Sequence, residues 1–375
     1  MMTKNLWEIY IEFPDCRSSY YDTNLSIDKL FGKEASEAKE ECMNFIVNEF
    51  SKGSKKEVLN IFLDDRRKSN LLESIRPTHM VGLYLLGMSL AKTFSFDLKK
   101  SLGDIISNID EWYDLKYTWY ITCLYHDITS CEEKNISETD SRMLQFQKEY
   151  SIFEHFLVNG KKFKRDNSEE TLIKKYYNYR LNKGRSDHGI VAGMQLFDSL
   201  CANFSEKTAG KEFCHNQIYL EGLSWRKEHL DHFAYIVDAI IWHNVWYAYT
   251  PEKIAEYKKD GLEELVIERN GKDNRIAFSN NPLRFMLCLL DTIEPIKRFN
   301  YTPAEKVLKG ISIIGTEKSD DTHQHSIIIS WKEYMEVESN FYLWMKGILE
   351  LKYWMNVNMG VCSCMEDGCQ LTISW

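Results

Sequence analysis

Long apolar stretches alternate with polar segments along this chain, and the apolar stretches have helical length and spacing. Residues 112–125 form a strongly apolar and aromatic run, which predicts a buried helix. Residues 223–247 contain no Gly or Pro and predict a second long helix, and residues 33–50 repeat apolar positions at the spacing of an amphipathic helix. The pattern therefore predicts a mainly α-helical protein.

Helix starts are marked by capping residues and by proline. Arg76-Pro77 opens a helix that contains His79, and Ser186 or Asp187 caps a helix that begins near His188. Asn281-Pro282 starts another helix, which we expect to bend at Pro295.

From about Thr302 the sequence pattern changes from long helical stretches to short strand-like segments. Residues 307–314, 326–331 and 369–375 read as short strands and residues 334–355 as a helix, which predicts a small α+β appendage. We expect three regions: an N-terminal helical support region (1–65), a helical domain with the candidate chemistry (66–303) and the appendage (304–375).

Composition narrows the class of protein. The 375 residues are 44% hydrophobic and 13% aromatic with only 6 Pro, which favours long helices packed by bulky side chains. The net charge of −9 makes duplex nucleic acid an unlikely partner and leaves a small anionic substrate easier to accommodate. No segment has the roughly 20 uninterrupted apolar residues of a membrane-spanning helix, so we expect no membrane partner and a cytoplasmic location.

The 10 cysteines are scattered, and several lie inside apolar helices, where a thiol behaves as a small hydrophobe. No disulfide framework is expected. Cys362, Cys364 and Cys369 form a cluster, but three sulfurs without a fourth ligand match no standard zinc spacing. We interpret that cluster as structural.

Candidate chemistry centres on His126-Asp127, which closes the helix of residues 112–125. Four further polar residues stand against strongly apolar stretches: His79, His188, His243 and Asp291. Isolated buried carboxylates and imidazoles are costly, so polar groups in several core helices are best explained if they converge on one compensating charge. The six side chains are therefore predicted to meet in space and bind metal.

Other candidates are weaker. His232 is a second candidate on the predicted helix of His243, and His229 lies nearer its polar end. Lys183 and Arg185 flank the start of the helix at His188, where exposed N–H groups favour an anion, so they are candidates for binding a substrate phosphate. Two basic residues in a loop are also typical of a solvated surface.

The ordered set His79, His126-Asp127, His188, His243 and Asp291 resembles the HD-domain superfamily of metal-dependent phosphohydrolases, and Ser186 to Gly193 looks like the segment after the HD pair in some bacterial members. The resemblance covers roughly residues 70–300. It implies a helical bundle in which His79, His126, Asp127 and Asp291 hold one metal. In two-metal members Asp127 would bridge, with His188 and His243 on the second ion, which makes Asp127 and His188 the expected catalytic residues.

The chain departs from several subfamilies of that superfamily. Ser130 stands where many members have Lys, and His126-Asp127 is followed by no GYP motif and by no acidic pair at the spacing of alarmone hydrolases. Cyclic-di-nucleotide and alarmone substrates are therefore less favoured.

These observations predict hydrolysis of a phosphate ester, of a nucleotide or small nucleotide-derived substrate, by metal-activated water. Mixed nitrogen and oxygen ligands suit one or two ions of manganese, iron, nickel, cobalt or zinc better than magnesium. A non-catalytic nucleotide-binding regulatory module is an alternative, although it should have lost ligands. A nuclease acting on single-stranded nucleic acid is another, with a groove built from residues 161–165 and Tyr176, Tyr177 and Tyr179.

Overall fold

The computed structural model describes residues 4–12, 26–32, 35–48, 71–93, 111–130, 133, 167–212, 217–220, 223–226, 229–267, 274–299, 302–317, 325–360, 363–365 and 368–375. The described part is mostly helical. Its α-helices are α1 (Leu6–Ile11), α2 (Ile27–Phe31), α3 (Ala35–Asn48), α6 (Arg76–Thr93), α8 (Glu111–Tyr125), α10 (Asn167–Asn182), α11 (His188–Thr208), α12 (His229–Trp242), α13 (Pro251–Lys259), α14 (Pro282–Ile293), α15 (Ala304–Gly310) and α16 (Phe341–Trp354). Short 3-10 turns, η3 (Glu263–Leu265) and η4 (Glu333–Met335), complete the helical elements.

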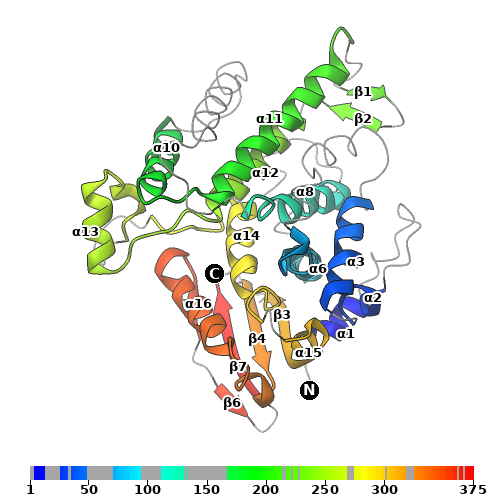
Figure 1. The fold of residues 1–375 in the computed structure, drawn as a ribbon, viewed down its shortest axis with the longest axis vertical. Coiled ribbons are helices and arrows are strands. Elements are labelled where there is room, and N and C mark those ends of the chain that lie inside the picture. The colour runs from blue at the N-terminus through cyan, green and yellow to red at the C-terminus, as the bar shows by residue number, and fades with distance from the viewer. Residues whose placement is uncertain are drawn as a thin grey trace.

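The helices that carry the candidate residues pack on one another at the centre of the molecule. Helix α12 contacts α8, α11 and α14, and α6 contacts α8 and α14. Figure 1 shows α14 at this centre, with α6 and α8 on one side and the paired α11 and α12 above. Helix α14 is buried along most of its length because apolar residues occupy nearly every position from Leu283 to Leu290.

The strands of the described residues form two antiparallel sheets. A hairpin joins β1 (Gln217–Leu220) and β2 (Leu223–Arg226). The larger sheet has the order β3 (Ile311–Glu317), β4 (His325–Trp331), β7 (Gly368–Ser374) and β5 (Asn358–Met359), and β6 (Ser363–Met365) also pairs with β7. Its register places buried isoleucine and leucine side chains in one row, because Ile313 lies opposite Ile329 and Ile329 opposite Leu371.

Helix α16 and the sheet lie on the side of α14 remote from α11 and α12 (Figure 1). The fully buried indole of Trp344 on α16 donates a hydrogen bond from Nε1 to the Ile293 carbonyl at 3.1 Å. The last turn of α14 is thereby fixed against α16.

Several predicted elements are confirmed. The mainly helical character and the small C-terminal sheet are both present, and α3, α8, β4 and β7 match the predicted segments closely. Asn281 caps α14 as expected, since its side chain accepts from the Arg284 N–H at 3.0 Å.

Other boundaries were wrong. Residues 307–310 end helix α15, and the strand begins only at Ile311. The predicted helix of residues 223–247 is in fact strand β2 followed by α12, which ends at Trp242. The sequence carries a hairpin signal that periodicity alone missed, because Glu221-Gly222 separates two short apolar-alternating segments. Helix α14 also ends at Ile293, before Pro295, and α16 begins only at Phe341.

His325, the first residue of β4, is buried. Its ring is buried against Phe278, with ring centroids 5.6 Å apart, and against Trp375 at 5.7 Å. Side chains alternate between the two faces of a strand, so His325 lies on the same buried face of β4 as Ile327 and Ile329.

The N-terminal and C-terminal regions are in contact. Helix α1 packs against α15, β3 and α6, and the Ser312 hydroxyl donates to the Lys4 carbonyl at 2.5 Å. One hydrophobic core runs through all three predicted regions, and the boundaries between them stay predictions. Within the described residues, no helix combines the length and apolar character needed to cross a membrane.

Helices α6 and α8 approach closely at Gly87. A Cβ there would lie 2.1 Å from the Trp119 indole, which is held in place by its hydrogen bond to the Tyr84 carbonyl at 3.1 Å. Only glycine leaves room for this ring. By contrast, a Cβ at Gly347 on α16 would meet nothing nearer than the Thr292 methyl at 3.9 Å.

We predict that Gly87→Ala lowers the free energy of unfolding by about 1–3 kcal/mol, because overpacking against the buried indole exceeds the helix-propensity gain. Gly347→Ala is the matched control and should be neutral or stabilising by up to about 1 kcal/mol. Urea denaturation of both variants measures the difference. Equal stability of the two variants would contradict the close approach of α6 to α8.

Candidate metal centre

His79 and His126 are brought together by the start of α6 and the end of α8. Their Nε2 atoms lie 3.3 Å apart, and both rings are fully buried. His126 Nδ1 donates to the Cys123 carbonyl at 2.7 Å, and His79 Nδ1 donates to Glu294 Oε2 at 2.7 Å. Because each Nδ1 carries the proton of its hydrogen bond, both Nε2 atoms turn toward the cluster.

His188 and His243 form a second pair with the same arrangement. His188 is the first residue of α11, and His243 follows the last residue of α12. Their Nε2 atoms are 3.2 Å apart. His243 Nδ1 donates to the Ile240 carbonyl at 2.5 Å, and His188 Nδ1 lies 3.0 Å from Glu133 Oε2.

Asp127 and Asp291 supply the carboxylates. Asp291 Oδ1 is 3.0 Å from His79 Nε2 and 3.4 Å from His126 Nε2. Asp127 reaches both pairs, since Oδ2 lies 3.4 Å from His126 Nε2 and Oδ1 lies 3.1 Å from His188 Nε2. Two groups result, one of His79, His126, Asp127 and Asp291 and one of Asp127, His188 and His243, with the ligand atoms of each group within 4.8 Å of one another.

These donor sets fit divalent metal ions. Neutral imidazoles hydrogen-bonded through Nδ1 present only lone pairs at Nε2, so two Nε2 atoms about 3 Å apart repel unless a cation or a proton lies between them. Asp127 Oδ1 is buried and accepts no hydrogen bond from the described residues, although His188 Nε2 is near it. A buried carboxylate oxygen without a donor is costly, and a bound cation would satisfy it.

Within the described part of the chain, the side chains of Arg76 and Lys297 are the cations that border the carboxylates. The Arg76 guanidinium pairs with Asp127 Oδ2, and Lys297 Nζ lies 2.8 Å and 3.0 Å from the two oxygens of Asp291. Burial alone would raise the pKa of Asp127, but Arg76, Lys297 and His126 outweigh burial and hold that pKa well below its usual value. The pKa of Asp291 is lowered in the same way, by Lys297, His126 and His79 against burial. Both carboxylates are therefore ionised at neutral pH.

Glu294 holds the ring of His79. Its carboxylate is fully buried and accepts from the backbone N–H groups of Ile296 at 3.0 Å and Lys297 at 3.1 Å. A Cβ at Gly82 would lie 2.9 Å from Glu294 Oε1, so this glycine leaves the space that the carboxylate occupies. Such outer hydrogen bonds set the tautomer and orientation of metal-binding histidines.

A network of side chains holds His188. Glu133 pairs with Arg180 of α10, and Asn244 Nδ2 donates to Asp187 Oδ2 at 2.9 Å and lies 3.3 Å from His188 Nδ1. Asp187 caps α11 by accepting from the Ile190 N–H at 3.0 Å. Burial lowers the pKa of His188, but the neighbouring carboxylates of Asp127 and Glu133 outweigh burial and raise it to about 9. Burial raises the pKa of Asp187 to about 6.

Gly189 allows α11 to approach His243. A Cβ there would lie 2.8 Å from the Ile240 carbonyl oxygen and 2.9 Å from His243 Cε1. The second pair of histidines therefore depends on a residue without a side chain one position after His188.

Comparison with protein-family models, curated proteins and solved structures finds no match to this chain.

The structure brings together all six residues predicted to bind metal: His79, His126, Asp127, His188, His243 and Asp291. Their role as ligands stays a prediction. His232 lies in α12, but its side chain is outside the described residues, as is that of His229. Lys183 is exposed and pairs with Glu256 of α13, and Arg185 is exposed. Among the described residues, the cations that contact the cluster carboxylates are Arg76 and Lys297.

The other candidates lie elsewhere. Cys362 is outside the described residues, as is the side chain of Cys364. Cys369 is disulfide-bonded, although the sequence predicts no disulfide framework. Residues 161–165 are also outside the described part. Tyr176, Tyr177 and Tyr179 are buried in the core, so these rings are not available to line a nucleic-acid groove.

Five residues of the centre were not singled out for it from the sequence: Arg76, Glu133, Asn244, Glu294 and Lys297. A weak signal existed for Arg76, which precedes His79 by three residues and so shares its helix face. Glu133 lies outside the apolar stretches of the sequence, and it contacts His188.

We predict that metal affinity rises with pH. In the metal-free protein the raised pKa of His188, about 9, means that a proton occupies this imidazole at neutral pH and must leave when metal binds. The pKa of His126 is also raised, because Asp127 and Asp291 outweigh burial. Affinity therefore increases with pH, and the apparent Kd should fall at least about tenfold per pH unit between pH 7 and pH 8.5. The pKa of His243 is lowered by burial and by the neighbouring histidines, so His243 adds no proton in this range. Calorimetry with Mn²⁺ measures the slope.

His188→Ala is the control for this pH dependence. The variant lacks the titrating imidazole and should show a flatter dependence of Kd on pH at the remaining ion. A wild-type Kd that does not change over this range would contradict the assignment.

Proposed function

We propose that this chain is a metal-dependent phosphohydrolase that hydrolyses a phosphate ester, of a nucleotide or small nucleotide-derived substrate, by attack of water. The observation that supports this proposal is the pair of histidine and carboxylate groups that share Asp127. The order of these residues along the chain, which resembles the HD-domain superfamily, supports the same proposal.

In this proposal, His79, His126, Asp127 and Asp291 hold one ion, and Asp127, His188 and His243 hold a second. The mixed imidazole and carboxylate set favours manganese, iron, cobalt, nickel or zinc over magnesium. A divalent ion there supplies an acidified water and neutralises charge on the phosphoryl oxygens.

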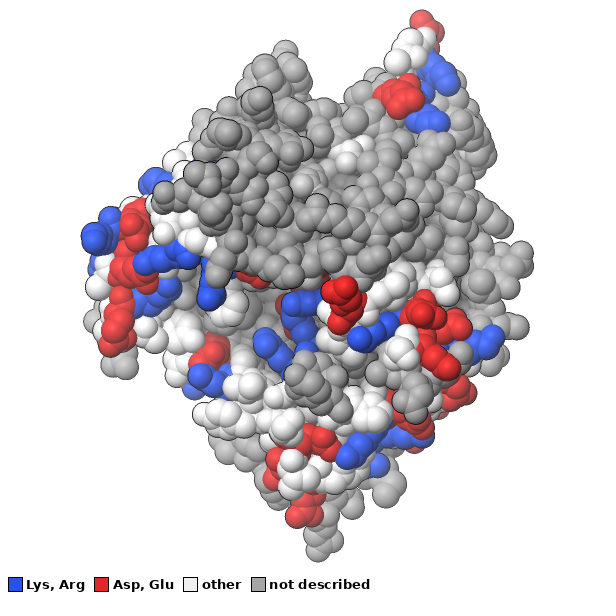
Figure 2. Space-filling model, in the orientation of Figure 1, with Lys and Arg blue, Asp and Glu red and all other residues white. Residues whose placement is uncertain are grey.

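Arg76 and Lys297 are the residues that we expect to bind the phosphoryl group. Their side chains are 26% and 17% exposed, whereas Asp127 beside them is fully buried. Once the carboxylate oxygens are taken by metal, the guanidinium and ammonium groups remain to pair with anionic oxygens of a substrate. In Figure 2 Lys and Arg side chains near the centre of the view lie beside Asp and Glu side chains. Two partly exposed cations next to the buried carboxylates suit a small anion despite the net charge of −9.

Asp127 and His188 connect the two groups of candidate ligands, because their side chains are in contact. His188 Nε2 lies 3.1 Å from Asp127 Oδ1, and the orientation of the His188 ring is fixed from behind by Glu133 and Asn244. A rigid contact between the groups keeps the reacting water and the phosphate in one geometry, which is the main requirement of phosphoryl transfer.

The alternatives are less well supported. A regulatory module that had kept the fold would be expected to have lost ligands, and here all six converge. A nuclease acting on single-stranded nucleic acid needs exposed aromatic side chains, and the three tyrosines considered for that role are buried. A small substrate is therefore favoured.

Replacing Asp127 tests the mechanism. Asp127→Ala removes a carboxylate from both groups, so hydrolysis should fall below detection and metal content should drop. Glu133→Gln and Glu294→Gln change only outer hydrogen bonds and should lower activity or metal affinity about 10- to 100-fold. Metal analysis is combined with a hydrolysis panel of nucleotides, cyclic nucleotides and short oligonucleotides.

Asp238→Asn is the matched control. Asp238 is a buried aspartate on α12 that pairs with Arg284 at 2.7 Å and lies outside both groups. This variant should keep metal and activity even if its stability falls. Near-wild-type turnover by folded Asp127→Ala would refute the metal-hydrolase proposal.

A further inference from the structure

Trp246 is a large aromatic side chain that is 61% exposed, in the loop that follows His243. Its backbone is held on both sides: the N–H donates to the Tyr176 hydroxyl at 3.2 Å, and the carbonyl accepts from the Tyr257 hydroxyl at 3.0 Å. Its indole Nε1 donates to Asn244 Oδ1 at 3.0 Å. The ring is therefore fixed in one orientation while most of its surface faces solvent.

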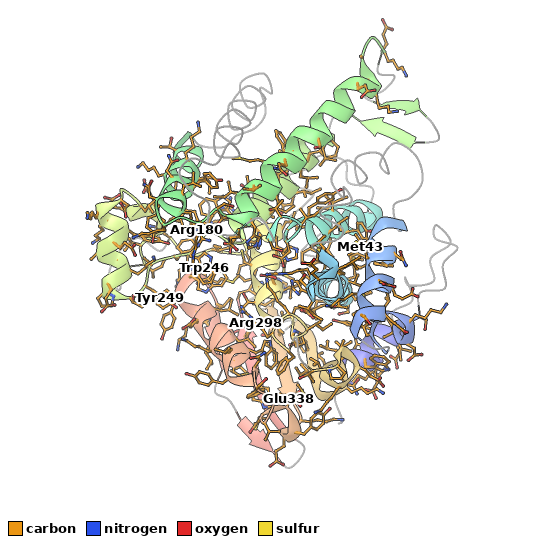
Figure 3. The ribbon with its side chains drawn as sticks, in the orientation of Figure 1. Met43, Arg180, Trp246, Tyr249, Arg298 and Glu338 are labelled. Carbon is orange, nitrogen blue, oxygen red and sulfur yellow. The ribbon has the colours of Figure 1, made fainter. Side chains whose placement is uncertain are left out.

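This ring is connected to the metal centre through Asn244. The amide of Asn244 receives the indole N–H on its oxygen and presents Nδ2 to Asp187 and to His188 Nδ1, at 2.9 Å and 3.3 Å. Trp246 is thus two polar contacts away from a candidate ligand. In Figure 3, Trp246 lies between Arg180 and Tyr249, on the side of the molecule that carries α10 and α13.

The rest of the loop is anchored to α16. Tyr249 stacks on Tyr353 with ring centroids 4.8 Å apart and planes inclined by 13°. The loop is therefore held at both ends, by the contacts of Asn244 and by this stack. A pre-positioned aromatic surface loses little conformational entropy when a flat ligand binds to it.

We propose that Trp246 binds the base of the nucleotide substrate by stacking, while the phosphate lies at the metal centre. This inference rests on the proposed function and adds the residue that distinguishes a nucleotide from a base-free phosphate ester. Each nucleobase has a π-face, so stacking on the indole selects for a base without selecting which one. Arg180 pairs with Glu133, which contacts His188, and Arg76 pairs with Asp127.

The test compares ligand binding by four proteins loaded with Mn²⁺: wild type, Trp246→Ala, Trp246→Phe and Tyr342→Ala. The ligands are the 5′-phosphonate analogue of adenosine monophosphate, which is not hydrolysed, and inorganic phosphate, which has no base. Trp246→Ala should weaken binding of the analogue about 5- to 150-fold and leave the Kd of phosphate unchanged. Tyr342→Ala removes another exposed ring, 73% exposed on α16, and should change neither Kd.

Trp246→Phe separates stacking from positioning. Phenylalanine keeps an aromatic face but lacks the N–H that Asn244 accepts, so a stacking role predicts that most of the affinity for the analogue remains. Equal losses in Trp246→Phe and Trp246→Ala, or a loss of phosphate binding in both, would show that Trp246 acts only through Asn244 and would overturn the proposal.

Turnover distinguishes this inference from the proposed function. If wild type binds the analogue through Trp246 but hydrolyses no nucleotide, the stacking inference holds and the proposed function fails. If wild type hydrolyses adenosine monophosphate and ribose 5-phosphate equally and Trp246→Ala has no effect on either, the inference fails and the function stands. An effect of Trp246→Ala on a tetranucleotide but not on the analogue would overturn the small-nucleotide proposal in favour of a single-stranded nucleic acid.

Discussion

The arrangement of the central helices depends on the burial of one carboxylate, that of Asp127. An ionised carboxylate without compensation at this depth would cost several kcal/mol. Asp127 follows α8, and its compensating groups come from α6, α11 and the turn after α14, in Arg76, His188 and Lys297. These elements must therefore converge at the end of α8, and the apolar faces beside each residue form the core that holds them there.

Two kinds of contact orient the four histidines: a hydrogen bond to a nearby backbone carbonyl, or a contact with a distant carboxylate. The position of each histidine relative to its helix determines which contact it makes. His126 and His243 follow helix C-termini and donate to carbonyls three residues earlier, those of Cys123 and Ile240. The last carbonyls of a helix have no intrahelical partner, so a local acceptor is available there. His79 and His188 lie in first turns, where the unpaired groups are N–H donors. Their Nδ1 atoms accordingly lie against distant carboxylates, Glu294 and Glu133.

The same difference explains how much could be predicted from sequence. Residues that are costly to bury stand out against an apolar run, so His126-Asp127 and Asp291 could be found, as could the helices that carry them. Glu294 and Glu133 were not found this way. Glu294 directly follows α14, but its partner His79 lies 215 positions away in the sequence. Glu133 follows no apolar run, and its partner His188 lies 55 positions away. The β1–β2 hairpin was missed because a run without Gly or Pro fits a helix equally well by periodicity.

The C-terminal unit supplies no candidate ligand among its described residues, yet it braces the centre at two points. Trp344 of α16 holds the Ile293 carbonyl at the end of the helix that carries Asp291, and Tyr353 of the same helix stacks on the loop that follows His243. Packed helices shift as units because their interiors are dense. A displacement of α16 would therefore move Asp291 and the loop of Trp246 together. Both the candidate metal ligands and the proposed base-binding residue thus depend on the position of α16.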